Sequence, residues 1–266
     1  MANPNQGLQF EWCIYHLAAV GLRLRGDADA VKAATQYKMA SAQLKKDAKT
    51  AVKCIETYGG AITKITKMSG GVEPKTDLLI RCARKTLKCS LKYGGAFQLS
   101  SAGIGSSVAF LSGVIANVAK QPGYDAKKAK EILEMLGEID ALYGGIGSMP
   151  KQLAEKKLGV GERYNAALKT LIGTSKAPTV TGAYGKFKLA IIHEAMTGQM
   201  TFKQTPNKIA DHVVSEKEIV PISAALVQKV ADKTSVRIGL KGRGHGTYRG
   251  KEVRMNEIVI RFDTRS

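Results

Sequence analysis

The chain has 266 residues, enough to bury a sizeable core, and carries 41 lysines and arginines against 22 aspartates and glutamates. Its formal net charge of +19 favours a polyanionic partner, because each phosphate that a cation neutralises releases condensed counterions. We therefore expect nucleic acid as the partner, although capsid, ribosomal and membrane-surface proteins are also basic.

The cysteines argue against a zinc site and a disulfide framework, because none of them has CxxC spacing (Cys13, Cys54, Cys82 and Cys89). Reduced thiols inside a cell are the better interpretation. The N-terminal MANPNQG lacks the charged and then apolar pattern of an export signal. We therefore expect a cytoplasmic protein, in the host cell if the chain is viral.

The first predicted helix covers residues 8–20, where apolar side chains recur on one face (Phe10, Cys13, Ile14, Leu17 and Ala18). Glu11 lies beside this stripe, but a glutamate in a first helical turn is favoured by the helix dipole in any case. Residues 27–58 predict one long helix or two, whose basic faces suit either solvent or a phosphate-contacting arm. Residues 61–68 predict a short strand.

The stretch 71–101 predicts a β-hairpin. Residues 76–80 form a short, largely apolar run after Pro74, and after a short basic turn at 81–84 apolar and polar residues alternate over 85–92. Such alternation is typical of a half-buried strand.

Asp77 on the first strand and Lys92 on the second can bring a carboxylate and an ammonium to the same edge of this sheet. A divalent cation held by an aspartate lowers the pKa of its bound water, and a nearby lysine can position that water or stabilise charge on a phosphate. The alternative is a solvated ion pair of little energetic value.

These residues resemble the PD-(D/E)XK nuclease superfamily, the fold of many restriction enzymes and phage nucleases. Its pattern is Pro-Asp followed, one strand later, by an acid, any residue and a lysine. Here Pro74-Lys75-Thr76-Asp77 matches the first part, Ser90-Leu91-Lys92 the second, and Gln98 the glutamine found beyond the lysine in several branches. Ser90 departs from the pattern, because serine is a poor Mg²⁺ ligand beside a carboxylate.

The resemblance implies hydrolysis of DNA phosphodiester bonds with Mg²⁺ or Mn²⁺ as the cofactor. The implied metal ligands are Asp77, an acid from Glu11 or Glu194, and the Leu91 carbonyl, with Lys92 and Gln98 as further catalytic residues. In this scheme Lys92 orients the attacking water. Glu11 matches by position, since the helix before the sheet often contributes a glutamate in this superfamily.

Residues 93–119 contain no charge, which raises the question of a membrane span. The Gly and Ser content and the polar Gln98 and Asn117 favour a packed internal helix at 102–120 instead. Further helices are predicted at 125–142 and 162–172.

A last predicted helix covers 184–197, and Glu194 falls on its apolar stripe (Phe187, Ala190 and Ile191). A carboxylate on an inward face needs a cation or a metal. Glu194 is therefore a candidate for the acid missing at Ser90, and a buried ion pair with a lysine is the alternative.

Residues 235–262 predict two strands joined by a glycine-rich basic loop, LKGRGHGTYRGKE, and these strands either extend the central sheet or form a separate hairpin. Glycines let a backbone approach a surface closely, and arginines grip phosphates. The predicted DNA contacts are Lys241, Arg243, Arg249 and Lys251. The alternative is a flexible, solvated hairpin tip.

The predicted architecture is α/β: a restriction-endonuclease-like mixed sheet flanked by the helices at 8–20 and 184–197, in one nuclease-like domain over residues 1–266. Helical insertions are expected at about 22–58 and 102–175, with a basic C-terminal hairpin at about 235–262. The expected function is a Mg²⁺-dependent DNA endonuclease that binds no membrane; a homo-oligomer is left open. The alternative, which Ser90 favours, is a non-catalytic nucleic-acid-binding or virion structural protein.

Overall fold

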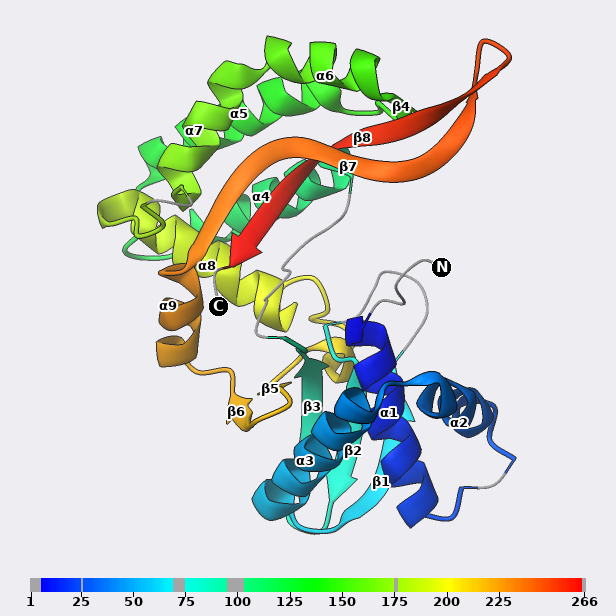
Figure 1. Cartoon of the computed structure of the whole chain (residues 1–266). Coiled ribbons are helices and arrows are strands. Elements are labelled where there is room, and N and C mark those ends of the chain that lie inside the picture. Colours follow the sequence, from blue (N-terminus) through cyan, green and yellow to red (C-terminus); the bar gives the residue numbers. More distant parts are fainter. Residues whose placement is uncertain (1–5, 25, 69–74, 95–102, 175–176, 265–266) are drawn as a thin grey trace. The chain divides into compact units, whose positions relative to one another are not determined.

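The computed structural model of the chain describes residues 6–24, 26–68, 75–94, 103–174 and 177–264 (Figure 1). The chain divides into two compact units. Unit 1 comprises Met1–Ala96 and Met196–Leu226, and unit 2 comprises Phe97–Ala195 and Val227–Ser266. The expectation of one nuclease-like domain over the whole chain stays a prediction.

Unit 1 is built on a mixed sheet of five strands in the order β1-β2-β3-β5-β6. The strands are β1 (Ile62–Lys67), β2 (Leu78–Cys82), β3 (Thr86–Leu91), β5 (His212–Val214) and β6 (Ile219–Pro221). The first three form an antiparallel meander, β5 joins β3 in parallel, and β6 is antiparallel to β5. The predicted α/β class with a mixed sheet is confirmed, as are the predicted hairpin and the strand before it.

Three helices precede this sheet: α1 (Gln6–Gly21), α2 (Ala28–Met39) and α3 (Ala42–Gly59). The region predicted as one helix or two is therefore two helices, and Ser41 begins the second by accepting a hydrogen bond from the Leu44 N–H. Apolar residues of α1 and α3 form one core with alternate residues of the sheet (among them Phe10, Ile14, Ile55, Leu78, Ile80, Leu87, Cys89 and Leu91). The side chains at the intervening sheet positions therefore point to the opposite face.

The short strand β5 is tied to β3 and α3 by a chain of polar groups. The Lys88 N–H donates to Asp211 Oδ1 (2.8 Å), and His212 Nδ1 lies 2.5 Å from the same oxygen. On its other side, His212 Nε2 lies 3.1 Å from the Tyr58 hydroxyl. These bonds fix a strand that is too short to be held by its backbone ladder alone.

Unit 2 contains helices and a second sheet of three strands in the order β4-β8-β7. Its helices include α4 (Ile104–Val118), α5 (Ala126–Tyr143), α6 (Lys151–Val160), α7 (Glu162–Ile172), nearly all of α8 (Gly182–Thr197) and most of α9 (Ala224–Ala231). The strands are β4 (Met149–Pro150), β7 (Thr234–Tyr248) and β8 (Lys251–Thr264). Because α8 belongs to unit 2, its expected position beside the first sheet stays a prediction.

The uncharged stretch contributes α4, whose apolar side chains are buried in unit 2 (Ile104, Val108, Leu111, Val114, Ile115 and Val118). Over the described part of the chain, no helix combines the length and the apolar character that crossing a membrane requires.

The glycine-rich stretch after Leu240 was expected to be a loop, and this expectation is wrong. Strands β7 and β8 stay paired through it as far as Tyr248 and Lys251, and the loop shrinks to Arg249 and Gly250. Both have positive φ (50° and 75°), as a type I′ hairpin turn requires. A bulge after Gly242 takes in Gly244 (φ 80°), so the glycines serve a continuous ribbon. The C-terminal strands therefore form a separate hairpin and do not extend the sheet of unit 1.

Gly161, between α6 and α7, has no room for a side chain. A Cβ there would lie 1.8 Å from the hydroxyl oxygen of Tyr143, a fully buried side chain whose hydroxyl donates to the Leu158 carbonyl (3.2 Å). We expect Gly161→Ala to lower the free energy of unfolding by about 1–3 kcal/mol, as overpacking does. Gly159→Ala is the matched control: it meets no atom within 4 Å and should be neutral or stabilising, as in helices generally. Denaturant unfolding of both variants checks this, and equal effects would contradict it.

Lys188 on α8 is 2% exposed, and its ammonium donates to the carbonyls of Pro178 and Thr234. Burial lowers the pKa of Lys188 to about 8, against a smaller opposite effect of Asp232. The pKa of an unfolded lysine is near 10.5, so between pH 8 and pH 10.5 the unfolded chain binds more protons at this residue than the folded chain does. The contribution of Lys188 to the free energy of unfolding therefore rises with pH in this window and does not change with pH below it.

We expect the free energy of unfolding of the wild type to gain on the order of 2–4 kcal/mol over that window from this one group. Lys188→Met should lack the gain, because no ammonium remains to titrate. Urea unfolding of both proteins at pH 7.5 and pH 10 isolates the effect as the difference between them. Parallel pH profiles would show that the Lys188 pKa is not lowered.

Candidate active site

The register of β2 and β3 places Asp77 opposite Ser90. Leu78 pairs with Cys89, and one residue earlier the Asp77 N–H donates to the Cys89 carbonyl (2.8 Å). Directly opposed residues of an antiparallel pair point to the same face. The Ser90 hydroxyl accordingly lies 3.5 Å from Asp77 Oδ2, at the long limit of a hydrogen bond.

The Asp77 carboxylate is held at the end of the sheet by the main chain. Its Oδ2 accepts a hydrogen bond of 2.6 Å from the Leu91 N–H. Because the N–H and C=O of one strand residue point to the same side, the Leu91 carbonyl is expected on the Asp77 side as well. This supports its predicted part as a further oxygen ligand.

Lys92 continues the ladder beyond the last residue of β3, since its N–H donates to the Val214 carbonyl of β5 (2.9 Å). Its side chain is half-buried. Strand alternation puts it on the face of Ser90, two residues earlier, and therefore on the face of Asp77. The three positions of the predicted motif thus share one face, and a direct approach of the Lys92 ammonium to the Asp77 carboxylate stays a prediction.

Glu11, at 8% exposure, forms an ion pair with Lys67, the last residue of β1. The Lys67 ammonium also lies 4.8 Å from the centre of the Trp12 ring. Burial lowers the pKa of Lys67, and the charge of Asp77 opposes this shift. Lys67 thus contacts Glu11 and interacts through space with Asp77. Because Lys67 is the register partner of Leu78, Lys67 and Glu11 lie on the core face of the sheet and Asp77 on the opposite face, so the two carboxylates can meet at one cation only around the end of the sheet.

Lys67 was not predicted as a site residue, because nothing in the sequence distinguishes it from the many other lysines. Only the packing of α1 on β1 brings it to Glu11, and only the pairing of β1 with β2 brings it to Asp77.

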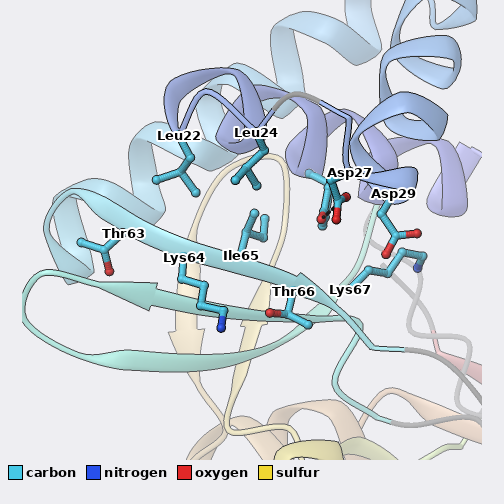
Figure 2. A pocket seen from close by; sticks show the side chains of 10 residues that line it. Leu22, Leu24, Asp27, Asp29, Thr63, Lys64, Ile65, Thr66 and Lys67 are labelled. Atoms are coloured by element: carbon cyan, nitrogen blue, oxygen red, sulfur yellow. Dashed lines mark hydrogen bonds between the residues drawn. The ribbon is translucent and has the colours of Figure 1, made fainter.

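A cavity of about 360 Å³ lies along β1 and the segment that joins α1 to α2 (Figure 2). Figure 2 shows the β1 side chains from Thr63 to Lys67 on one side, with Asp27 and Asp29 across from them. Tyr15 also lines it and donates to Asp27 (3.3 Å); burial, followed by Asp27, raises the Tyr15 pKa to about 12. The cavity reaches Lys67, and hence the Glu11 ion pair.

The remaining predicted residues fall into three groups. Glu194 is 1% exposed in unit 2, so its assignment as a ligand beside Asp77 stays a prediction. Pro74 and Gln98 lie outside the described residues. Within the described ranges no cluster of three or more His, Cys, Asp or Glu side chains is placed to hold a metal ion. The candidate ligands Asp77, Glu11 and the Leu91 carbonyl all supply oxygen, the donor atom that Mg²⁺ accepts.

The predicted DNA contacts lie on the β7–β8 ribbon of unit 2. Arg249 and Lys251 are exposed near its turn. Arg243 instead forms an ion pair with Glu257, which is also the register partner of Lys241. Arg254, which sequence reasoning did not single out, is exposed on β8 opposite His245.

Three comparisons were made for this chain, with models of protein families, with curated proteins and with solved structures, and none of them finds a match.

Proposed function

We propose that this chain is a Mg²⁺- or Mn²⁺-dependent DNA endonuclease, with its site where β2 begins and β3 ends in unit 1. The observation that carries the proposal is the strand register, which sets Asp77 opposite Ser90 with Lys92 two residues along the same face. A carboxylate and an ammonium on neighbouring strands are the two groups that metal-assisted phosphodiester hydrolysis needs first. The net charge of +19 supports a polyanionic substrate.

Each residue has a distinct part in this proposal. Asp77, kept in place by the Leu91 N–H, would supply the first carboxylate to the metal, with the Leu91 carbonyl as a further donor. Glu11, which lies with Lys67 on the core face, would reach the same cation around the end of the sheet. A bound Mg²⁺ lowers the pKa of a coordinated water and neutralises charge on the phosphate. Lys92 would orient the attacking water and stabilise the negative charge that grows on the phosphate oxygens.

Lys67 sets a condition on Glu11. Its ammonium is already paired with the Glu11 carboxylate, so Glu11 can serve as a ligand only when this ion pair opens. A divalent cation can replace the ammonium there, because its higher charge interacts more strongly with the Glu11 carboxylate.

We expect Asp77→Asn and Lys92→Met each to reduce Mg²⁺-dependent cleavage of plasmid DNA by at least roughly 100-fold, because each removes a charged group that acts on the reacting phosphate or its water. Lys53→Met, an exposed position on α3, is the matched control and should cleave like the wild type. Gel analysis of nicked and linear plasmid measures the loss, and DNA affinity of the two site variants shows that they remain folded. Wild type and variants that bind DNA and are equally inert would end the nuclease proposal.

A second candidate is a nucleic-acid-binding protein without cleavage. It is favoured by the fact that both carboxylates already have partners within the chain: Asp77 accepts from the Leu91 N–H, and Glu11 is paired with Lys67. In this case both acids would only stabilise the fold.

A double-mutant cycle at Glu11 and Lys67 tests whether Glu11 is a metal ligand or only a structural partner of Lys67. Glu11→Gln should destabilise by roughly 3–5 kcal/mol because it leaves a buried ammonium unpaired, and adding Lys67→Met should recover most of this loss. Under the nuclease proposal, Lys67→Met alone frees the Glu11 carboxylate for a cation. Millimolar Mg²⁺ should therefore raise the Tm of Lys67→Met more than that of the double variant, which keeps Asp77 as its only carboxylate ligand. Equal responses of the two to Mg²⁺ would remove Glu11 as a ligand.

A further inference from the structure

The outer part of the β7–β8 ribbon is exposed and regular. Beyond the bulge, strand pairing continues from His245–Arg254 to Tyr248–Lys251 and closes with the two-residue turn at Arg249 and Gly250. In Figure 1 this part of the ribbon extends past helices α5 and α6 of the same unit. At about 3.3 Å per residue, residues 245–248 give it a length of roughly 13 Å.

The strand register decides where its cations point. Lys251 lies opposite Tyr248, whereas Arg254 lies opposite His245. Three positions separate Lys251 from Arg254 along β8, so they point to opposite faces of the ribbon. Arg249 occupies the turn itself, where its guanidinium lies 5.5 Å from the centre of the Tyr248 ring. The exposed ribbon therefore carries a cation on each face and a third at its tip.

We propose that this ribbon enters the major groove of double-stranded DNA. An element that lies along a single phosphate backbone needs cations on one face only, whereas an element inside a groove has a phosphate backbone on each side. The undistorted major groove, about 12 Å wide, admits a two-stranded ribbon with side chains on both faces, whereas the minor groove, about 6 Å wide, would first have to be widened at a cost in deformation energy.

This inference rests on the proposed DNA partner and adds that the partner is a duplex. Lys251 and Arg254 would contact the backbones on the two sides. Arg249 at the turn would reach deepest, where its guanidinium fork can donate two hydrogen bonds to the N7 and O6 atoms of a guanine. The one acid among residues 245–254 of the ribbon is Glu252, on the same face as Arg254. Its Oε1 lies 3.5 Å from Nδ1 of His245 on the paired strand.

Binding is measured on the Asp77→Asn background, without divalent ions, so that cleavage plays no part. The ribbon variant is Arg249→Gln/Lys251→Gln/Arg254→Gln. The control is Lys127→Gln/Lys156→Gln/Lys169→Gln, which removes the same charge from exposed positions on α5, α6 and α7 of the same unit. All six positions are exposed, so both variants should melt at the wild-type temperature, which calorimetry confirms before binding is compared.

Fluorescence anisotropy of a short duplex should show an affinity loss of at least roughly 100-fold for the ribbon variant, and a slope of log Kd against log salt lower by about 2–3. The control should change far less in both. Equal losses in the two variants would overturn the inference, since total charge would then explain binding. Equally tight binding of a single strand by the Asp77→Asn parent would overturn it as well.

Methylation with dimethyl sulfate identifies the groove, because guanine N7 lies in the major groove and adenine N3 in the minor groove. The parent should protect guanine N7, and the ribbon variant should lose that protection while adenine N3 stays reactive throughout. Protection of adenine N3 instead, or of neither atom, would overturn the inference.

Cleavage by the wild type is scored separately, so that the two proposals can fail independently. An inert protein that still protects guanine N7 refutes only the nuclease proposal, and an active protein without N7 protection refutes only the proposed major-groove contact of the ribbon.

Discussion

The pairing of β2 with β3 is the constraint on which the candidate site depends. With Leu78 opposite Cys89, the apolar residues of both strands point into the core of unit 1, and Ser90 points to the other face. A slip of one residue would turn Lys88 and Ser90 inward and expose Cys89, and burying an unpaired ammonium is far more costly than burying a thiol. The apolar core thereby fixes the register, and the register decides which side chains share the face of Asp77.

This dependence explains why the hairpin could be predicted and its neighbours could not. Alternation over residues 86–92 is long enough to reveal a period of two, whereas β5 and β6 contain three residues each and show no period. Their positions come from contacts distant in sequence, such as the bond between the Lys88 N–H and Asp211, 123 residues apart. Helix α6 lies in the expected helical insertion but was not predicted as a helix of its own, because glycines such as Gly159 near its end are usually turn signals; its Cβ position is open, and the helix tolerates it.

The cations illustrate the same limit. Glycines between Lys241 and Gly250 suggest a loop, and in a loop all basic residues are equivalent; pairing with β8 overrides this local preference. In the ribbon each cation has a register partner, so Glu257 engages Arg243, while Arg254 is exposed opposite His245. Composition therefore predicts that the ribbon is basic, and only the pairing tells which of its charges can face a partner.

The serine that departs from the family pattern has a physical explanation in the charges around it. The Ser90 hydroxyl lies 3.5 Å from an oxygen of Asp77, so an acid at that position would put two carboxylates side by side, and one of them would resist ionisation unless a cation were present. Lys67 is already paired with Glu11, and burial disfavours its charged form. A serine beside Asp77 avoids this repulsion. Under the proposed nuclease function the cost is one oxygen ligand, so metal binding would depend more strongly on Glu11, which is paired with Lys67 in this structure.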